Sequence, residues 1–199
     1  MLKALVLLPL AAFALIAAKA PPPPAEPAMP SIAAPADVAA NPANKLTLEL
    51  SNGGAVVIQL RPDIAPKHVE RIQTLVRQGF YNGIGFHRVI PGFMAQGGDP
   101  KGTGEGGSTL PDLKAEFTQM PFLRGTVAAA RLGDNVDSAN SQFFICFVPN
   151  ASLFGQYSIF GRVISGMDTV DKIAPGEPPP QPTKIVKAYL GDTAVTAAQ

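Results

Sequence analysis

The residue whose type and surroundings point most directly to chemistry is Arg88, which lies in the segment Phe86–Ile90 among large apolar side chains. Arginine is rarely buried without a partner, because its guanidinium stays charged and needs hydrogen-bond acceptors. Two explanations stay open from these residues alone. Arg88 is either a structural cation that pairs with an acid such as Asp99 or Glu116, or a cation placed for function.

The elements that must position Arg88 are mostly short strands. Leu46, Leu48 and Leu50 alternate with polar residues, and the turn-forming sequence Ser51–Gly54 separates them from a second apolar run, Ala55–Leu60. This pattern predicts a β-hairpin. Short apolar runs split by glycine predict further strands at 85–90, 93–96, 125–130, 143–147, 159–163 and 185–190.

Few helices are expected. Residues 66–78 carry apolar side chains at helical spacing and are followed by Gly79, which can end a helix, and a second short helix is expected at 167–173. Two helices cannot cover both faces of a parallel sheet. The pattern therefore predicts a mainly β fold built as a closed antiparallel barrel, with a proline-rich loop at 175–182 before the last strand.

Residues 1–20 have the features of a secretory signal peptide. Lys3 precedes a run of about 15 largely apolar residues, which is shorter than the roughly 20 that span a bilayer, and Ala18-Lys19-Ala20 offers small residues at the cleavage spacing. We expect a periplasmic or secreted protein that is free of the membrane once the signal is removed. Pro21 hinders cleavage, so an uncleaved membrane anchor stays open as an alternative.

The segment 21–44 is expected to be a disordered linker. Eight of the 21 prolines fall within residues 21–42, among alanines and very few charges, and such a composition cannot bury a core. The ordered domain is then expected at 45–192, followed by a flexible tail at 193–199.

Composition excludes several classes of function. Lysine and arginine number 16 against 15 acidic residues, which gives no basic surface for nucleic acid. The single cysteine, Cys146, rules out an intrachain disulfide and a cysteine-cluster metal site, and its apolar surroundings predict a buried, inert thiol. We expect no metal and no cofactor.

Two weak motifs are better explained as loops. Residues 102–107 fit the dinucleotide fingerprint GxGxxG, but no helix start follows that could bind a pyrophosphate, so we expect a loop beside a groove. Residues 134–138 lack the central glycine and final glutamate of a calcium loop and predict a turn. Of the two histidines, His68 is expected to be solvated and His87 to point away from Arg88.

Five blocks resemble the cyclophilin family in their order and spacing: FHRVIPGFMAQGGDP, GTGEGG, GTVAAAR, NSQFFICF and YSIFGRV. The similarity extends from about Lys45 to Leu190, and the chain looks like an exported bacterial member. The resemblance implies a closed eight-stranded antiparallel β-barrel capped by two α-helices. It also implies peptidyl-prolyl cis/trans isomerase activity in a groove on the outer face, acting as a monomer on proline-containing peptides and unfolded proteins.

The resemblance also implies roles for individual residues. Arg88 matches the catalytic position, and Ser152 stands where well-known eukaryotic members carry a tryptophan that helps to bind cyclosporin, which predicts weak binding of that drug. Substrate-binding positions fall on Phe93, Met94, Gln96, Ala130, Arg131, Phe144, Leu153 and Tyr157.

Two other classes of protein stay open. A binding module could grip proline-containing peptides without useful catalysis, although a pure binder gains nothing from a cation at Arg88. A barrel that encloses a small ligand fits less well, because the many Phe, Leu and Ile residues are expected to fill the interior.

Overall fold

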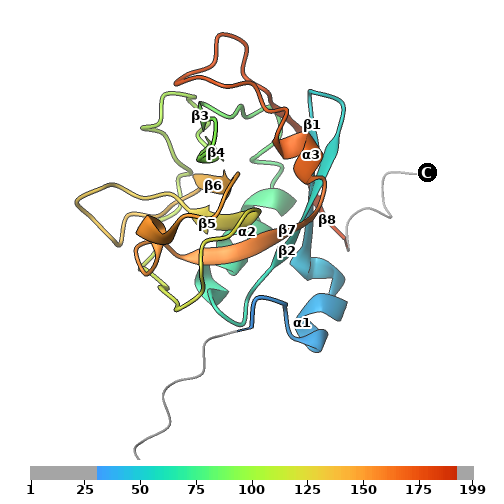
Figure 1. Cartoon of the computed structure of the whole chain (residues 1–199), viewed down its shortest axis with the longest axis vertical. Coiled ribbons are helices and arrows are strands. Elements are labelled where there is room, and N and C mark those ends of the chain that lie inside the picture. The colour runs from blue at the N-terminus through green and yellow to red at the C-terminus, as the bar shows by residue number, and fades with distance from the viewer. Residues whose placement is uncertain (1–30, 192–199) are drawn as a thin grey trace, which may run out of the picture.

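A computed structural model describes residues 31–191 of the 199-residue chain, and its centre is an eight-stranded antiparallel sheet (Figure 1). The strands are β1 (Lys45–Leu50), β2 (Ala55–Leu60), β3 (Arg88–Ile90), β4 (Met94–Gly97), β5 (Thr126–Ala129), β6 (Phe143–Cys146), β7 (Ile159–Ser165) and β8 (Ile185–Leu190). Their order across the sheet is β3-β4-β6-β5-β7-β2-β1-β8. The predicted hairpin is confirmed as β1 and β2, which pair in antiparallel register.

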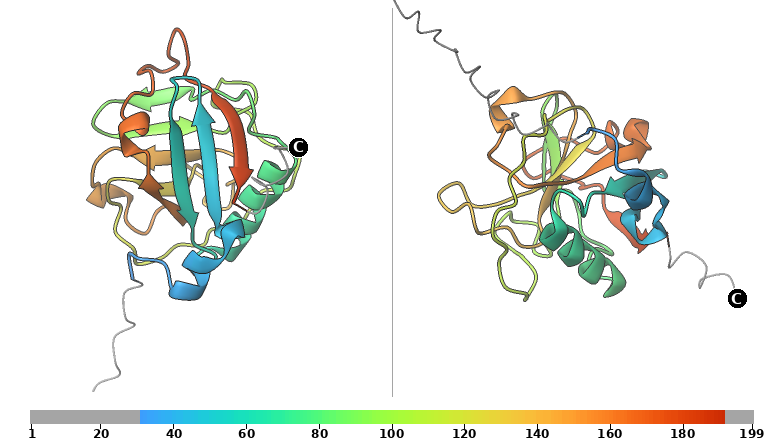
Figure 2. Two further views of the ribbon diagram at one scale, coloured as in Figure 1. Left: turned by 90° about the vertical axis from the view of Figure 1, so that its right-hand side faces the viewer. Right: turned by 90° about the horizontal axis from the view of Figure 1, so that it is seen from below.

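The longest helix is α2 (Pro66–Arg77), which confirms the helix predicted at 66–78. Pro66 occupies its first turn, where a missing N–H costs no hydrogen bond, and Gly79 follows its end with φ +69°. The apolar side chains of α2 pack into the core, and Figure 2 shows the helix beside β8. The helix α3 (Met167–Val170) is shorter than predicted. Within residues 31–191, no helix is both long and apolar enough to cross a membrane.

The predicted closed barrel is wrong, because the sheet is curled but open between β3 and β8. Across this seam there is no continuous ladder: isolated bridges join Gly85 to Lys184 and Val89 to Gly176, with a few further backbone hydrogen bonds near the start of β8. The chain that leads into β8 runs along the edge of β3 and carries the prolines of the 175–182 loop. Proline has no N–H to donate, so this chain cannot continue a ladder of hydrogen bonds and close the sheet.

Residues 31–44 belong to the ordered fold instead of the expected linker. They form α1 (Ala36–Ala40) and a 3₁₀ turn at Pro42–Asn44, and Val38 is buried. The Gln59 side-chain amide donates to the carbonyl oxygens of Val38 (3.4 Å) and Asn44 (3.1 Å), which fastens the segment to β2. The expected signal peptide at 1–20, the rest of the linker at 21–30 and the tail at 193–199 lie outside the described residues.

Strands β4, β5 and β6 are buried on both faces, so their alternating side chains build two apolar clusters. One cluster fills the inside of the curled sheet, under α2. The other lies on its outer face. Members on the inner face include Ala95, Val127 and Ile145, and members on the outer face include Met94, Ala128 and Phe144.

Candidate active site

Arg88 begins a row of side chains that crosses four strands on the outer face. Arg88 of β3 lies directly opposite Gln96 of β4, Gln96 opposite Phe144 of β6, and Phe144 opposite Ala128 of β5. Residues directly opposite each other in antiparallel strands share one face, with Cβ atoms about 4.5–5.5 Å apart. Backbone register alone therefore brings a cation and an amide to the edge of an apolar surface.

The apolar surface centres on Phe144, which is 5% exposed. Its ring stacks on Phe122, with centroids 6.3 Å apart and planes at 13°, and meets the edge of Tyr157 at 5.3 Å. The predicted positions in or packed against this outer cluster are Phe93, Met94, Ala130, Phe144, Leu153 and Tyr157. The structure thus gathers most of the predicted substrate-binding residues in one apolar cluster on the outer face of the sheet.

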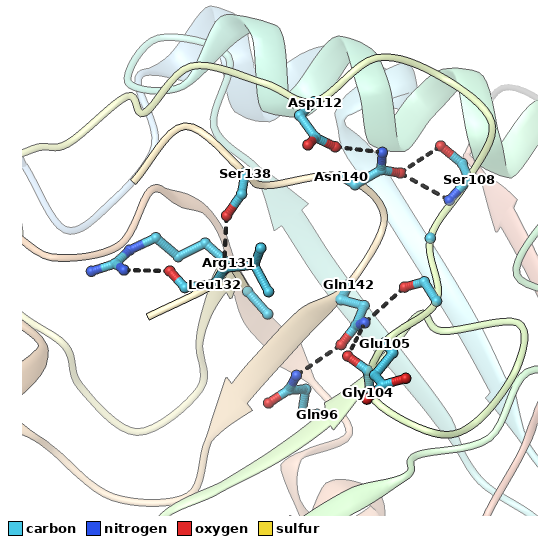
Figure 3. Close-up of a pocket in the computed structure, with 13 residues that line it drawn as sticks. Gln96, Gly104, Glu105, Ser108, Asp112, Arg131, Leu132, Ser138, Asn140 and Gln142 are labelled. Carbon is cyan, nitrogen blue, oxygen red and sulfur yellow. Dashed lines mark hydrogen bonds between the residues drawn. The ribbon is translucent and has the colours of Figure 1, made fainter. Parts of the chain in front are cut away.

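Gln96 belongs to a chain of amide hydrogen bonds beside that surface (Figure 3). Its Nε2 donates to Oε1 of Gln142 (2.9 Å), and Nε2 of Gln142 donates to the carbonyl oxygens of Gly104 and Gly106, both at 2.8 Å. This chain fixes the Gln96 amide. Among the described residues nothing donates to Oε1 of Gln96, which can therefore accept an N–H from a bound peptide.

An open pocket of about 300 Å³ adjoins the apolar surface (Figure 3). Gln96, Ala130 and Arg131 line it, whereas Phe93 and Phe144 do not, so it lies beside the apolar surface instead of over it. Residues that sequence reasoning missed form much of its wall: Ser108, Asp112, Leu132, Ser138, Asn140 and Gln142. Residues 104–107 also line it, which agrees with the prediction of a loop beside a groove. The only sequence signal for Gln142 was its place directly before the aromatic strand β6.

Asn140 ties the walls of this pocket together. Its Oδ1 accepts from the backbone N–H (2.9 Å) and hydroxyl (2.7 Å) of Ser108, and its Nδ2 donates to Asp112 Oδ1 (2.9 Å). Two chain segments far apart in the sequence, 108–112 and the one that carries Asn140, therefore meet at one amide. Such cross-links hold a site in shape before a ligand arrives.

Arg131 connects two loops at the other side of the pocket. Its Nε donates to Gln156 O (3.0 Å), its Nη1 donates to Leu132 O (2.7 Å), and its guanidinium lies 4.8 Å from the centroid of Tyr157. A cation over an aromatic face is attractive. The structure therefore places Arg131 at the pocket, but with much of its donor capacity already used by the protein.

The glycine-rich segment 102–107 surrounds a carboxylate. Asp99 accepts backbone N–H groups from Lys101 (2.7 Å), Thr103 (2.9 Å) and Gly104 (2.7 Å). Burial acts to raise the pKa of Asp99, but these donors outweigh it and the pKa is lowered. No helix follows this loop before β5, which agrees with the prediction that it is not a dinucleotide site.

The partner of Arg88 is neither of the acids that the sequence suggested. Arg88 Nε donates to Oε2 of Glu177 at 2.7 Å, whereas Asp99 holds its own loop. Glu116 instead contacts His68, whose Nδ1 lies 2.6 Å from its Oε2. His68 is 2% exposed, so the prediction that it is solvated is wrong.

Three other titratable side chains are buried: His68, His87 and Cys146. Burial lowers the pKa of His68 despite its contact with Glu116, and it also lowers the pKa of His87. Cys146 is buried as predicted, and burial raises its thiol pKa to about 12. Within residues 31–191, no three His, Cys, Asp or Glu side chains are grouped to hold a metal.

Comparisons with known proteins place this arrangement in a family context. The family described as cyclophilin type peptidyl-prolyl cis-trans isomerase/CLD matches residues 45–190. A probable peptidyl-prolyl cis-trans isomerase from Brucella suis is 52% identical over 168 residues, which cover 76% of this chain and 85% of that protein. A peptidyl-prolyl cis-trans isomerase from Helicobacter pylori is 42% identical over 131 residues, which cover 64% of this chain and 78% of that protein.

Solved structures agree with these relatives. A cyclophilin from Hirschia baltica superposes with a TM-score of 0.69 at 30% identity, over 75% of this chain and 74% of that one. A cyclophilin type isomerase from Cryptosporidium parvum, crystallised in the presence of the dipeptide Ala-Pro, superposes with a TM-score of 0.68 at 27% identity, over 73% of this chain and 98% of that one.

Proposed function

This chain belongs to the cyclophilin-type peptidyl-prolyl cis-trans isomerases, and we propose that Arg88 is the residue that accelerates the rotation. The reaction turns an X–Pro amide whose partial double bond sets a barrier of about 18–20 kcal/mol. In the twisted transition state the prolyl nitrogen becomes pyramidal and regains its lone pair. A guanidinium can donate a hydrogen bond to that nitrogen, whereas the planar ground-state amide offers no such acceptor. Arg88 then binds the transition state more strongly than the substrate, which is the condition for catalysis.

The substrate is a proline-containing peptide, bound across the row of side chains that begins at Arg88. The apolar surface around Phe144 would hold the proline ring while the rest of the peptide turns. Oε1 of Gln96 would accept a backbone N–H of the same peptide. The Ala-Pro dipeptide in the Cryptosporidium parvum cyclophilin experiment supports this substrate class. No covalent bond breaks, so the proposed steps use only donors, acceptors and apolar contacts of this chain.

The observation that carries the proposal is the register of β3, β4 and β6. It sets Arg88 beside Gln96 and Gln96 beside Phe144 on one face. A permanent cation, a fixed amide and an apolar surface are thus adjacent without any rearrangement of the chain. Arginine suits the role better than lysine, because its donors form a rigid planar fork that points them in fixed directions.

The test is Arg88→Ala in the full chain, with turnover of a proline-containing peptide as the readout. Loss of one preorganised transition-state donor typically lowers turnover by about 10²–10³-fold, and we expect a loss of that order. Arg124→Ala serves as the matched control, because Arg124 is similarly exposed (44% against 41%) and also pairs with an acid, Asp171. Near-wild-type turnover in Arg88→Ala would refute the role of Arg88. If the wild type and Arg88→Ala both bind the peptide tightly and show equally low turnover, the protein is a binding module.

We further propose that the protein is exported and assists the folding of other exported proteins. Support comes from the N-terminal sequence, in which Lys3, an apolar run and Ala18-Lys19-Ala20 follow the order of a signal peptide. The experiment expresses the full chain in a Gram-negative bacterium and measures the mass of the product in each cell fraction. A periplasmic product that begins at Pro21 is expected. A full-length product in the membrane fraction would instead establish an anchor, and a full-length soluble product in the cytoplasm would refute export.

The folding role has its own measurement. An exported protein whose refolding is limited by proline isomerisation refolds over tens to hundreds of seconds, and the wild-type chain should shorten that phase. Arg88→Ala should not. Equal acceleration by both proteins would show that any assistance comes from binding alone.

A further inference from the structure

The carboxylate that contacts Arg88 is brought there by the loop that covers the open seam of the sheet. Val89 N donates to Gly176 O (2.8 Å), and Gly176 N donates to Val89 O (3.0 Å), so these two residues form an antiparallel bridge. One step further in the same register, Arg88 lies opposite Glu177. The cross-strand row of the active site therefore continues across the seam, from Gln96 through Arg88 to Glu177.

Further contacts hold this loop against β3. Thr183 fastens its other end, because its Oγ1 accepts from Ala174 N (3.0 Å) and its carbonyl accepts from Phe86 N (2.9 Å). Gly176 has φ +141°, and a Cβ there would lie 2.7 Å from the Cα of Pro179, so only glycine fits. Figure 1 shows the loop beside β3 at the top of the molecule. The position of Glu177 is thus built into the fold.

We propose that Glu177 is a positioning residue that holds the Arg88 guanidinium in its catalytic orientation. The carboxylate accepts a hydrogen bond from the Nε–H of Arg88, on one side of the planar guanidinium. Both terminal nitrogens stay available to a substrate. No other residue in the range 31–191 makes a side-chain hydrogen bond to Arg88. The long arginine side chain would otherwise sample many rotamers, so its single partner decides how often its donors face the groove.

The exposure of the Arg88–Glu177 pair indicates that its loss should change turnover more than folding stability. Arg88 is 41% exposed and Glu177 52%, and ion pairs that accessible to water add little to folding stability. Charge alone would make Glu177 unfavourable, since it offsets the cation that faces the substrate. The benefit must then come from orientation, and its loss should lower kcat more than it raises KM.

The experiment compares Glu177→Ala and Glu177→Gln in the full chain, each alone and combined with Arg88→Ala, with kcat and KM measured on a proline-containing peptide. We expect Glu177→Ala to lower kcat by about 5- to 20-fold, with little change in KM or melting temperature, since a loosened group is less often in reacting geometry. Glu177→Gln should lose less, because its amide oxygen still accepts from Nε. In the Arg88→Ala background, Glu177→Ala should change nothing further.

Asp171→Ala is the matched control, since Asp171 pairs with Arg124 at similar exposure away from the row, and it should keep full turnover. Unchanged or higher turnover in Glu177→Ala would overturn the inference, and higher turnover would mean that Glu177 restrains Arg88 instead. An equal loss in the Arg88→Ala background would overturn it too, by showing that the loop matters for structure alone. The inference rests on the proposed role of Arg88, and Arg88→Ala tests that role separately.

Discussion

Phe144→Ala separates the structural and the binding role of the outer cluster, because the ring serves both. Phe144 is 5% exposed and lies between Phe122 and Tyr157. Truncation of a buried phenylalanine typically costs about 3–5 kcal/mol of unfolding free energy, from lost burial and from the cavity that remains. Its two ring contacts belong to pairs worth roughly 0.5–1.5 kcal/mol each beyond burial. We therefore expect the upper part of that range.

The assay is urea and thermal unfolding followed by circular dichroism. For a chain of this size about 1 kcal/mol shifts the melting temperature by roughly 2–4 °C, so a cost of about 4–5 kcal/mol lowers it by about 8–20 °C. Phe117→Ala is the control, because Phe117 is 40% exposed and should lose little. Turnover, measured well below both melting temperatures, should fall as well, since the ring forms the middle of the apolar surface.

Phe144→Leu keeps the prediction testable if the alanine variant does not fold. Leucine keeps most of the apolar volume, and such swaps usually cost less than about 1.5 kcal/mol, but it removes the stacking on Phe122. Its turnover should still fall. A Phe144→Ala protein that melts like Phe117→Ala would refute the burial argument, and unchanged turnover in Phe144→Leu would refute the binding argument.

Three further predictions concern pH, the thiol and the drug. The folded-state pKa values of His68 and Glu116 are lowered from 6.5 and 4.5, so the unfolded chain binds protons first as pH falls. The unfolding free energy measured by urea titration should therefore decrease below about pH 6.5, and constant or rising stability down to pH 4 would contradict this. Burial raises the pKa of Cys146 to about 12, so iodoacetamide at pH 8 should label it only in denaturant, as mass spectrometry would show; rapid labelling of the folded protein would contradict this. Ser152→Trp should raise the affinity for cyclosporin by about 1–3 kcal/mol in calorimetry with turnover kept, because Ser152 lies exposed beside Leu153; tight binding by the unmodified protein would show that the position is unimportant.

The strands and the main helix could be predicted because their side chains follow simple periods. Leu46, Leu48 and Leu50 face one side of β1, and the apolar residues of α2 face one side of that helix. The row of side chains from Arg88 to Phe144 could not be predicted from such a period. It follows from register, which depends on how three strands pair, and the sequence carried it only as blocks that resemble a family.

What the sequence missed depends on contacts between distant segments. Composition predicts that residues 31–44 cannot bury a core, and by themselves they do not. They are ordered because Gln59 and Arg61 donate to their carbonyl oxygens, Arg61 at 3.0 Å from Ser31 O. His68 was expected in water for a similar reason. Helical spacing gives its place on α2, but not that Glu116, 48 positions later, folds over it at 2.6 Å.

The open seam of the sheet explains both the wrong prediction of a closed barrel and the contact between Arg88 and Glu177. A closed barrel would pair β3 with β8, and a continuous ladder would leave no room for an irregular loop beside Arg88. Because prolines interrupt the chain before β8, that chain makes only isolated bridges, at Gly176 and Lys184, and beside Arg88 it contributes a side chain, Glu177. A regular strand would use its backbone groups in hydrogen bonds along the whole of β3. This loop makes one bridge to β3 and places the Glu177 carboxylate beside the Arg88 guanidinium. The same residues that keep the sheet open thus complete the surroundings of Arg88, and a loop replaced by a regular strand should lose turnover while it gains stability.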